Sequence, residues 1–564
     1  MAGEGQSGRD TPVGSERRAG AADRATNAAG SNEEQKLGPE VASARQAGVV
    51  VDKWTRWMIA IAVMMSAVME LVDTSAVNVS LPYIAGNLSA TVDEATWVLT
   101  SYLIANAIIL PMSGWLANYF GRRRLLMISV VGFTAASILC GLAPTLPLLV
   151  IFRILQGTMG GPLQPTTRAI MLEAFPREER GHAMALWGVG IVIAPIVAPL
   201  LGGWLTTDHS WRWVFFINIP VSIVGIFLVW KYVFDPPYIR RPKTPIDYWG
   251  MGMLATGIAA LQVVFDKGQE DDWFGSHFIV AMAVIAAIRL ISFVIWELRT
   301  RHPVVHFKLF RYRTFVTGTS LSLMLFFSLY GSIVLLPLFM QELLNFPAIT
   351  AGLWNSPRGI ATMIMMPIAG YLIGKRWDMR ALLAGGLIVS AIGAYMFSYL
   401  NLNAGPWNFF WPQMVMGAGL SFMFVPLATI TVDPIPQEEM GYATSLIALA
   451  RNLGAGIGIS VFTAFIARRD QFHQVRLAAS MHQEPGLWSR TLRGLEAYLM
   501  HKGVGSASAA HQAMAMLYQE LLRHASALSY LDGFRVIAVL LLITVPFVWI
   551  MRKPQFKSGE AGAD

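Results

Sequence analysis

The chain has 564 residues, of which 54% are hydrophobic and only 14% are charged, and its mean hydropathy is +0.49. Soluble domains carry about 25% charged residues, so the composition excludes an ordinary soluble protein and indicates one that crosses a membrane many times. The net charge of +8 does not indicate nucleic-acid binding, because the basic residues alternate with apolar runs along the chain.

Residues 1–52 contain much Gly, Ala and Ser and no apolar core. This composition is typical of disorder, so we expect a disordered cytoplasmic tail. The segment lacks the apolar core of a signal peptide. The first apolar run is therefore expected to act as its own insertion signal.

Fourteen apolar runs follow, each near the roughly 20 residues that cross the hydrocarbon core as a helix. We expect spans at about 56–79, 95–117, 125–143, 147–170, 182–205, 212–233, 247–265, 276–296, 315–339, 349–374, 380–399, 407–431, 441–466 and 532–551. An even number of spans returns both ends of the chain to the same side of the membrane.

The loops between these runs differ in charge. If the N-terminus is cytoplasmic, the short outer loops hold only Arg212 and Lys267, and the short cytoplasmic loops hold runs such as 122–124 and 240–243. Lys and Arg are enriched in cytoplasmic loops. The sequence therefore predicts a multi-pass membrane protein with both termini in the cytoplasm.

The first expected span contains two acids, Glu70 and Asp73, which lie three residues apart and so share one helix face. An ionised Asp at the centre of a membrane helix costs roughly 2.5–3.5 kcal/mol. We expect these acids to form a proton site, a cation site or a buried ion pair. Arg153, near the outer end of the fourth span, is a candidate partner for Asp73. The alternative is that Arg153 extends to the interface.

Two further motifs combine glycine with residues that shape helices. In GWLANYFGRRR (114–124), Gly114 and Gly121 permit a tight turn and close helix approach. The following Arg122 and Arg123 would anchor the loop at the anionic leaflet, which is also the simpler explanation of the whole motif.

The fifth expected span contains APIVAPLLGGWL (194–205). Pro195 and Pro199 remove two backbone donors and bend a helix. Gly202 and Gly203 allow another helix to pack against the backbone.

These motifs, with LVDTSAVNVSLP (71–82) and RILQGTMGG (153–161), occur in an order that resembles the major facilitator superfamily. Within it, the chain is similar to the fourteen-span drug:proton antiporters of the EmrB/QacA type, over about residues 55–550. It departs from their motifs in three places: Asn118 replaces a loop acid, Ala198 replaces a glycine, and Glu70 is an additional acid.

The resemblance implies an all-α membrane protein with the major facilitator fold, two six-helix bundles plus two additional transmembrane helices. The expected divisions are the tail 1–52, a bundle 53–233, a linker with two helices 234–313, a bundle 314–552 that includes a periplasmic loop 467–531, and a tail 553–564. That outer loop places Met514, Leu517, Leu521 and Leu522 at helical spacing. It is either a self-packed surface loop or a docking surface for a periplasmic partner.

The implied function is proton-driven export of hydrophobic or amphipathic toxic compounds, with the proton gradient as energy source and no cofactor. Asp73, Glu70 and Arg153 would couple transport to proton movement. The glycine, proline and arginine motifs, with Asn118, would open and close the transport path. Arg358 and Arg451 in the second half are candidate substrate or gating charges, or structural pairs between helices. The implied partners are a periplasmic membrane-fusion adaptor of the EmrA type, an outer-membrane channel, small hydrophobic drugs and the lipid bilayer.

Two alternatives remain open. One is a dedicated exporter of one metabolite or fatty acid, and the other is a membrane sensor or enzyme without transport. The sequence contains no phosphate-cradling loop and no nucleophile–base pair that would indicate an enzyme. Cys140 is the single cysteine, so there is no disulfide framework, and no Cys/His cluster has metal-ligand spacing.

Overall fold

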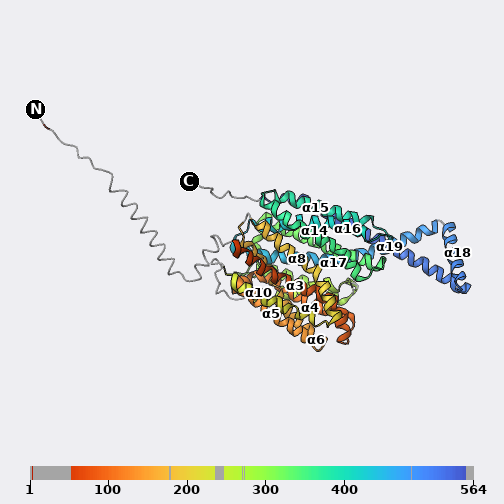
Figure 1. Ribbon diagram of the computed structural model, residues 1–564, viewed down its shortest axis with the longest axis horizontal. Helices are drawn as coiled ribbons and strands as arrows, with labels where there is room; N and C mark the ends of the chain where they lie inside the picture. The colour runs from red at the N-terminus through yellow and green to blue at the C-terminus, as the bar shows by residue number, and fades with distance from the viewer. Residues whose placement is uncertain are drawn as a thin grey trace.

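The computed structural model describes residues 53–176, 179–235, 247–269, 273–483 and 485–553, with Gly3 and Asp271. These residues form helices joined by short turns and contain no strand (Figure 1). The expected tail 1–52, most of the linker 234–246 and the tail beyond 553 lie outside the described residues.

The first half of the chain forms one helical bundle. Its helices are α3 (Lys53–Asn87), α4 (Val92–Phe120), α5 (Arg122–Leu142), α6 (Leu146–Gly160), α7 (Leu163–Ala174), α8 (Arg180–Asp208), α9 (Trp213–Phe216) and α10 (Asn218–Tyr232). The fourth expected span is divided into α6 and α7, because Pro162 has no amide hydrogen with which to continue the helix.

Two helices follow, α11 (Tyr248–Lys267) and α12 (His277–Glu297), which pack against each other. Lys267 Nζ donates to Thr96 Oγ1 of α4 at 3.1 Å, and Ser460 Oγ of α17 (Met440–Gln483) donates to the carbonyl of Phe265 at 2.8 Å. Helix α12 exposes Ile288 and Ile291 by 58% and 61%. The pair therefore lies against both halves and presents an apolar outer face suited to lipid.

The second half forms another bundle of long helices. They are α13 (Arg313–Leu338), α14 (Ala348–Gly374), α15 (Met379–Met396), α16 (Trp407–Ile430), α17 (Met440–Gln483), α18 (Pro485–His501) and α19 (Ser506–Thr544). Short helical turns are η1 (Trp273–Gly275), η2 (Phe307–Arg311), η3 (Phe339–Leu343), η4 (Phe397–Tyr399), η5 (Gln437–Glu439) and η6 (Pro546–Ile550).

Within the described residues, twelve helices are long and apolar enough to cross a membrane. Helices α8 and α14 coincide with the fifth and tenth expected spans but are not among those twelve. For α8, the stretch Arg180–Ala194 is apolar but shorter than a membrane span. The all-α membrane architecture is confirmed, whereas the number fourteen stays a prediction.

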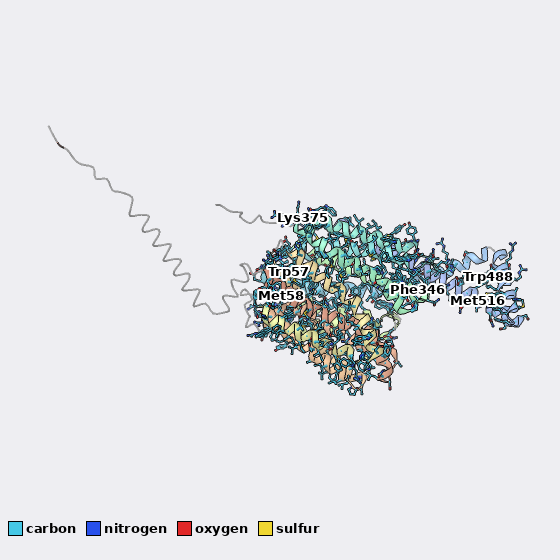
Figure 2. The ribbon with its side chains drawn as sticks, viewed as in Figure 1. Trp57, Met58, Phe346, Lys375, Trp488 and Met516 are labelled. Atoms are coloured by element: carbon cyan, nitrogen blue, oxygen red, sulfur yellow. The ribbon has the colours of Figure 1, made fainter. Side chains whose placement is uncertain are left out.

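The expected outer loop 467–531 forms a helical hairpin. Met514, Leu517, Leu521 and Leu522 lie in α19, as their helical spacing predicts, but the helices extend well beyond these four residues. Helix α17 continues to Gln483 and α19 begins at Ser506, which extends α17 by about 25 Å beyond residue 466. Helix α18 packs on α19 through Leu499, Ala509 and Ala513. Figure 2 labels Trp488 and Met516 on this hairpin.

The opposite end of the bundle carries most of the described basic loop residues, and we call it the basic end. It includes Arg122, Arg313 and Lys375, and Figure 2 labels Trp57 and Lys375 there. The two halves pack closely at this end, where a Cβ on Gly114 would lie 2.7 Å from the Cα of Tyr442. Ser113 and Ser445 also share a hydrogen bond of 2.7 Å. The basic end is therefore closed.

Candidate functional site

A buried ion pair lies in the middle of the first bundle. Arg153 Nη1 of α6 donates to Asp73 Oδ2 of α3 at 2.7 Å, and both side chains are fully buried. Arg153 also lies over the rings of Tyr102 and Phe215, at 4.7 and 5.3 Å from the ring centres. Arg153 therefore binds within the protein, and the alternative that it extends to the interface is wrong.

Neutral side chains complete the coordination of Asp73. Its Oδ1 accepts from Gln156 Nε2 at 3.0 Å and from Asn218 Nδ2 at 2.7 Å. Gln156 follows Arg153 by three residues and so shares its helix face, and Asn218 is the first residue of α10. Three donors from α6 and α10 thus converge on one carboxylate of α3, as an acceptor-only carboxylate requires.

Glu70 lies one helical turn from Asp73 and has neutral side chains as partners. Its Oε1 accepts from Asn106 Nδ2 at 2.8 Å and from the Tyr102 hydroxyl at 3.5 Å. Its Oε2 is buried without a hydrogen bond of good geometry among the described residues, and the side chain of Gln164 is a further hydrogen-bond partner of the carboxyl group. The two acids therefore differ: Asp73 is bonded to a charged group and two amides, whereas Glu70 is bonded to neutral side chains alone.

The loop motif lies where the halves meet. Gly121 joins α4 to α5 with a φ of +88°, a conformation that favours glycine. Asn118 forms a side-chain hydrogen bond with Tyr442 of the second half. Asn118 therefore contacts the other half, although it lacks the charge of the acid that it replaces.

The two arginines after Gly121 contact acidic side chains that the sequence did not predict as partners. Arg122 is fully buried and pairs with Glu173 of α7, and it donates to the carbonyl of Gln437 at 3.3 Å. The backbone N–H of Arg123 donates to Asp235 Oδ1 at 2.7 Å. These contacts join the loop to both halves, which is more than attachment to the membrane surface.

In α8, the glycine pair has unequal surroundings. A Cβ on Gly202 would lie 2.9 Å from the Cα of Ala76 in α3, whereas the nearest atom to a Cβ on Gly203 is Val79 Cγ1 at 4.0 Å. Gly202 is thus the position where α3 and α8 approach most closely in this motif. The side chains of Pro195 and Pro199 lie outside the described residues.

Arg358 of α14 is a structural pair with neutral groups. Its Nε donates to Gln413 Oε1 at 2.6 Å and its Nη1 donates to Ser332 Oγ at 2.9 Å. Arg358 is 6% exposed, and its partners Gln413 of α16 and Ser332 of α13 both belong to the second bundle.

Arg451 of α17 does lie at that boundary. Its guanidinium lies 4.4 Å from the ring centre of Phe326 and 5.6 Å from that of Trp187, which belongs to the first half. Arg168, which the sequence reasoning did not single out, lies 5.8 Å from the same indole. Its signal in the sequence was a basic residue within an apolar run, six residues after Pro162.

Two comparisons identify the class of protein. The Major Facilitator Superfamily model matches residues 63–459. The fold is similar to that of a human organic anion transporter, MFSD10, with a TM-score of 0.54 at 11% identity over 87% of this chain and 99% of that one. It is similar to the proton:xylose symporter XylE with a TM-score of 0.56 at 15% identity, over 88% and 96%. The chain belongs to the major facilitator superfamily.

Curated relatives narrow the class. The chain is 36% identical to the fatty acid resistance protein FarB of Neisseria gonorrhoeae, over 88% of this chain and 95% of FarB. It is 34% identical to the multidrug export protein EmrB of Escherichia coli K12, over 89% and 96%, and 38% identical to EmrB of Haemophilus influenzae, over 74% and 82%. It is thus an efflux transporter related to EmrB and FarB, which confirms the expected family and its non-enzymatic character.

Proposed function

We propose that this protein is a proton-driven multidrug exporter of the bacterial inner membrane, with fourteen spans and both termini in the cytoplasm. Bundles 53–233 and 314–552 would enclose the substrate path, with the pair in 234–313 beside them. The observation that carries the proposal is the fully buried Asp73–Arg153 pair in helices suited to cross the membrane. Intramembrane ionisable residues commonly belong to proton relays.

The proposed proton site is Asp73, with Arg153 as its counter-charge and Glu70 as an accessory acid. A proton on Asp73 neutralises the carboxylate that holds α3, α6 and α10 together. Loss of this attraction frees the helices to reorient, which is the two-state element that coupling requires. One proton that crosses the full field yields about 2.3 kcal/mol per 100 mV, enough for a modest drug gradient.

Gating is assigned to the closed basic end. The contact of Gly114 with Tyr442 and the bond between Ser113 and Ser445 hold the two halves together there. An exporter that alternates its access must separate these contacts to admit substrate from the cytoplasm. The motif residues Asn118, Gly121, Arg122 and Arg123 lie at the same contact and are assigned to its opening and closing.

The hairpin α17–α18–α19 is proposed to face the periplasm and to dock an EmrA-like membrane-fusion adaptor that leads to an outer-membrane channel. Its support is the length by which α17 continues beyond residue 466, and the exposed Tyr498, Met514 and Tyr518. Deletion of residues 480–525 should abolish co-purification of the adaptor. Unchanged recovery would remove the hairpin from the interface.

The proposed function is tested by expression in a pump-deficient host. Cells should survive several unrelated hydrophobic compounds and extrude ethidium, and a protonophore should stop the extrusion. Extrusion that persists without a proton gradient would contradict the antiport mechanism. Protection against one compound alone would favour the second candidate, a dedicated metabolite or fatty-acid exporter, which the 36% identity to a fatty acid resistance protein supports.

A further inference from the structure

Two arginines from opposite halves face one indole ring at the boundary between the bundles. Arg168 of α7 and Arg451 of α17 lie 5.8 and 5.6 Å from the ring centre of Trp187 in α8. Trp187 is fully buried, Arg168 is 4% exposed, and Arg451 is half-buried. The two guanidinium groups are close enough to repel each other.

Three donors at this place lack an acceptor. Arg168 Nε, Arg451 Nε and Trp187 Nε1 are buried without a hydrogen-bond partner in the described part of the chain. Arg168 Nη2 donates to the carbonyl of Ala428 at 3.1 Å. Buried polar groups in folded proteins are nearly always paired, so this convergence of donors has the character of a binding site for an acceptor.

No acidic side chain of the described residues forms an ion pair with either arginine. Glu70 attracts Arg451 electrostatically, but its Oε1 is held by Asn106 and Tyr102. A buried charge such as that of Arg168, with a second positive charge nearby and no bonded anion, is costly. A ligand carboxylate would satisfy the charge and the unpaired donors together, because guanidinium groups bind carboxylates with good geometry.

Aromatic rings form a wall beside these donors. Phe424 stacks on Trp187 at 6.0 Å between ring centres, and Phe326 lies beneath Arg451. Phe424, Phe326 and Tyr330 are each half-buried. Such a surface suits an alkyl chain or a ring attached to the carboxylate.

We propose that Arg168 and Arg451, which both lie within 6 Å of the Trp187 ring centre, bind the carboxylate of an amphipathic anionic substrate at the boundary between the two bundles. The inference rests on the proposed export function and specifies one substrate class for it. The negative headgroup of a lipid offers the same chemistry, and the experiment separates the two sources.

The test uses the full chain in phosphatidylcholine nanodiscs, with dissociation constants measured by calorimetry for laurate, its methyl ester and dodecyltrimethylammonium. Arg451→Gln and Arg168→Gln should each weaken laurate binding about tenfold or more, as loss of a charged hydrogen bond predicts. Binding of the cation should be unchanged or tighter. Trp187→Phe, which removes only one donor, should weaken laurate binding by a smaller factor.

Arg358→Gln is the matched control, because it removes a buried arginine that already has partners. It should leave laurate binding unchanged. Equal laurate affinity in wild type and Arg451→Gln, or an equal loss in Arg358→Gln, would overturn the proposal. If Arg451→Gln does not fold, Arg451→Lys and Trp187→Phe decide: unchanged laurate affinity in both would overturn it.

Nanodiscs in which about a third of the lipid is phosphatidylglycerol distinguish a site for substrate from a site for a lipid headgroup. Unchanged laurate affinity supports a substrate site, and strong competition by the lipid overturns that assignment. Ethidium extrusion by the wild-type protein in cells should be protonophore-sensitive. That readout reports on the antiport mechanism alone, so the two proposals can fail separately.

Discussion

In each half of the protein a buried arginine bridges helices of its own bundle, Arg153 in the first and Arg358 in the second, and the two clusters differ in the chemistry of their partners. Arg153 pairs with the carboxylate of Asp73, whereas Arg358 bonds to the amide of Gln413 and the hydroxyl of Ser332. Both bridge helices within one bundle. The first cluster contains a group that can take up a proton, and the bonded groups of the second do not titrate in the physiological range.

The two arginine clusters have similar geometry, but their partners indicate different roles. A buried charge pair is weak evidence for stability, so retention of an acid in the first cluster indicates function. The neutral partners of Arg358 bond two of its nitrogens and include no group whose charge changes with the proton gradient. Proton coupling is therefore expected in the first half, and a structural role in the second.

The largest contrast is expected from the two arginines themselves. Arg153→Gln leaves the carboxylate of Asp73 buried without its counter-charge, which costs about 3–5 kcal/mol. Arg358→Gln leaves only neutral groups unpaired and should cost about 1–3 kcal/mol. Thermal unfolding of both variants in detergent measures the difference. Equal losses would mean that the ion pair contributes nothing beyond its hydrogen bonds.

A smaller effect is expected from the glutamine in each arginine cluster, Gln156 in the first half and Gln413 in the second. Gln156→Leu removes one donor to Asp73, and Gln413→Leu removes the acceptor of Arg358. Each should destabilise the protein by about 1–3 kcal/mol. Only Gln156→Leu should shift the pH dependence of ethidium transport in vesicles, because it alone changes the surroundings of the carboxylate. The same shift in both variants would refute the division of roles.

The glycines of α8 provide a test that involves no charge. Gly202→Ala places a methyl group against the backbone of Ala76 and should cost about 1–3 kcal/mol. Gly203→Ala is its matched control, since open space surrounds that Cβ, and its unfolding temperature should not fall. A loss of similar size in both would show that helix packing around α3 is not as specific as the contact implies.

The smallest effect is expected from Glu70→Gln. Glu70 is bonded to neutral side chains alone and attracts Arg451 electrostatically. Its neutralisation should lower resistance to cationic compounds by a few fold, about 1 kcal/mol, and should leave resistance to neutral compounds unchanged. Dose–response curves for one compound of each charge measure this, and a uniform loss would place Glu70 in the proton pathway itself.

The sequence predicted the parts of this comparison that depend on helical spacing and on the ends of spans. Glu70 and Asp73 share a face because they are three residues apart, and the positions of Asp73 and Arg153 along their expected spans made them candidate partners. Gln156 was not predicted, although its place three residues after Arg153 could have indicated that it shares the same helix face. These features depend on positions within single helices, so they can be predicted without knowing how the bundles pack.

Contacts between distant helices could not be obtained in that way. Arg168 and Arg451 are 283 positions apart in the chain, and only the packing of the two halves brings both to Trp187. The hairpin was missed for a different reason. Residues 467–483 are polar, so an apolar window ends before them, although α17 continues because its backbone bonds are satisfied within the helix.

Proton movement in proteoliposomes tests the central claim most directly. Vesicles that contain wild-type protein and a pH-sensitive dye should show proton movement when ethidium is added, and Asp73→Asn should reduce it to the level of empty vesicles. Arg358→Lys, as the control in the second half, should retain it. Substrate-driven proton movement that persists in Asp73→Asn would contradict the account, whatever the stability of the variant.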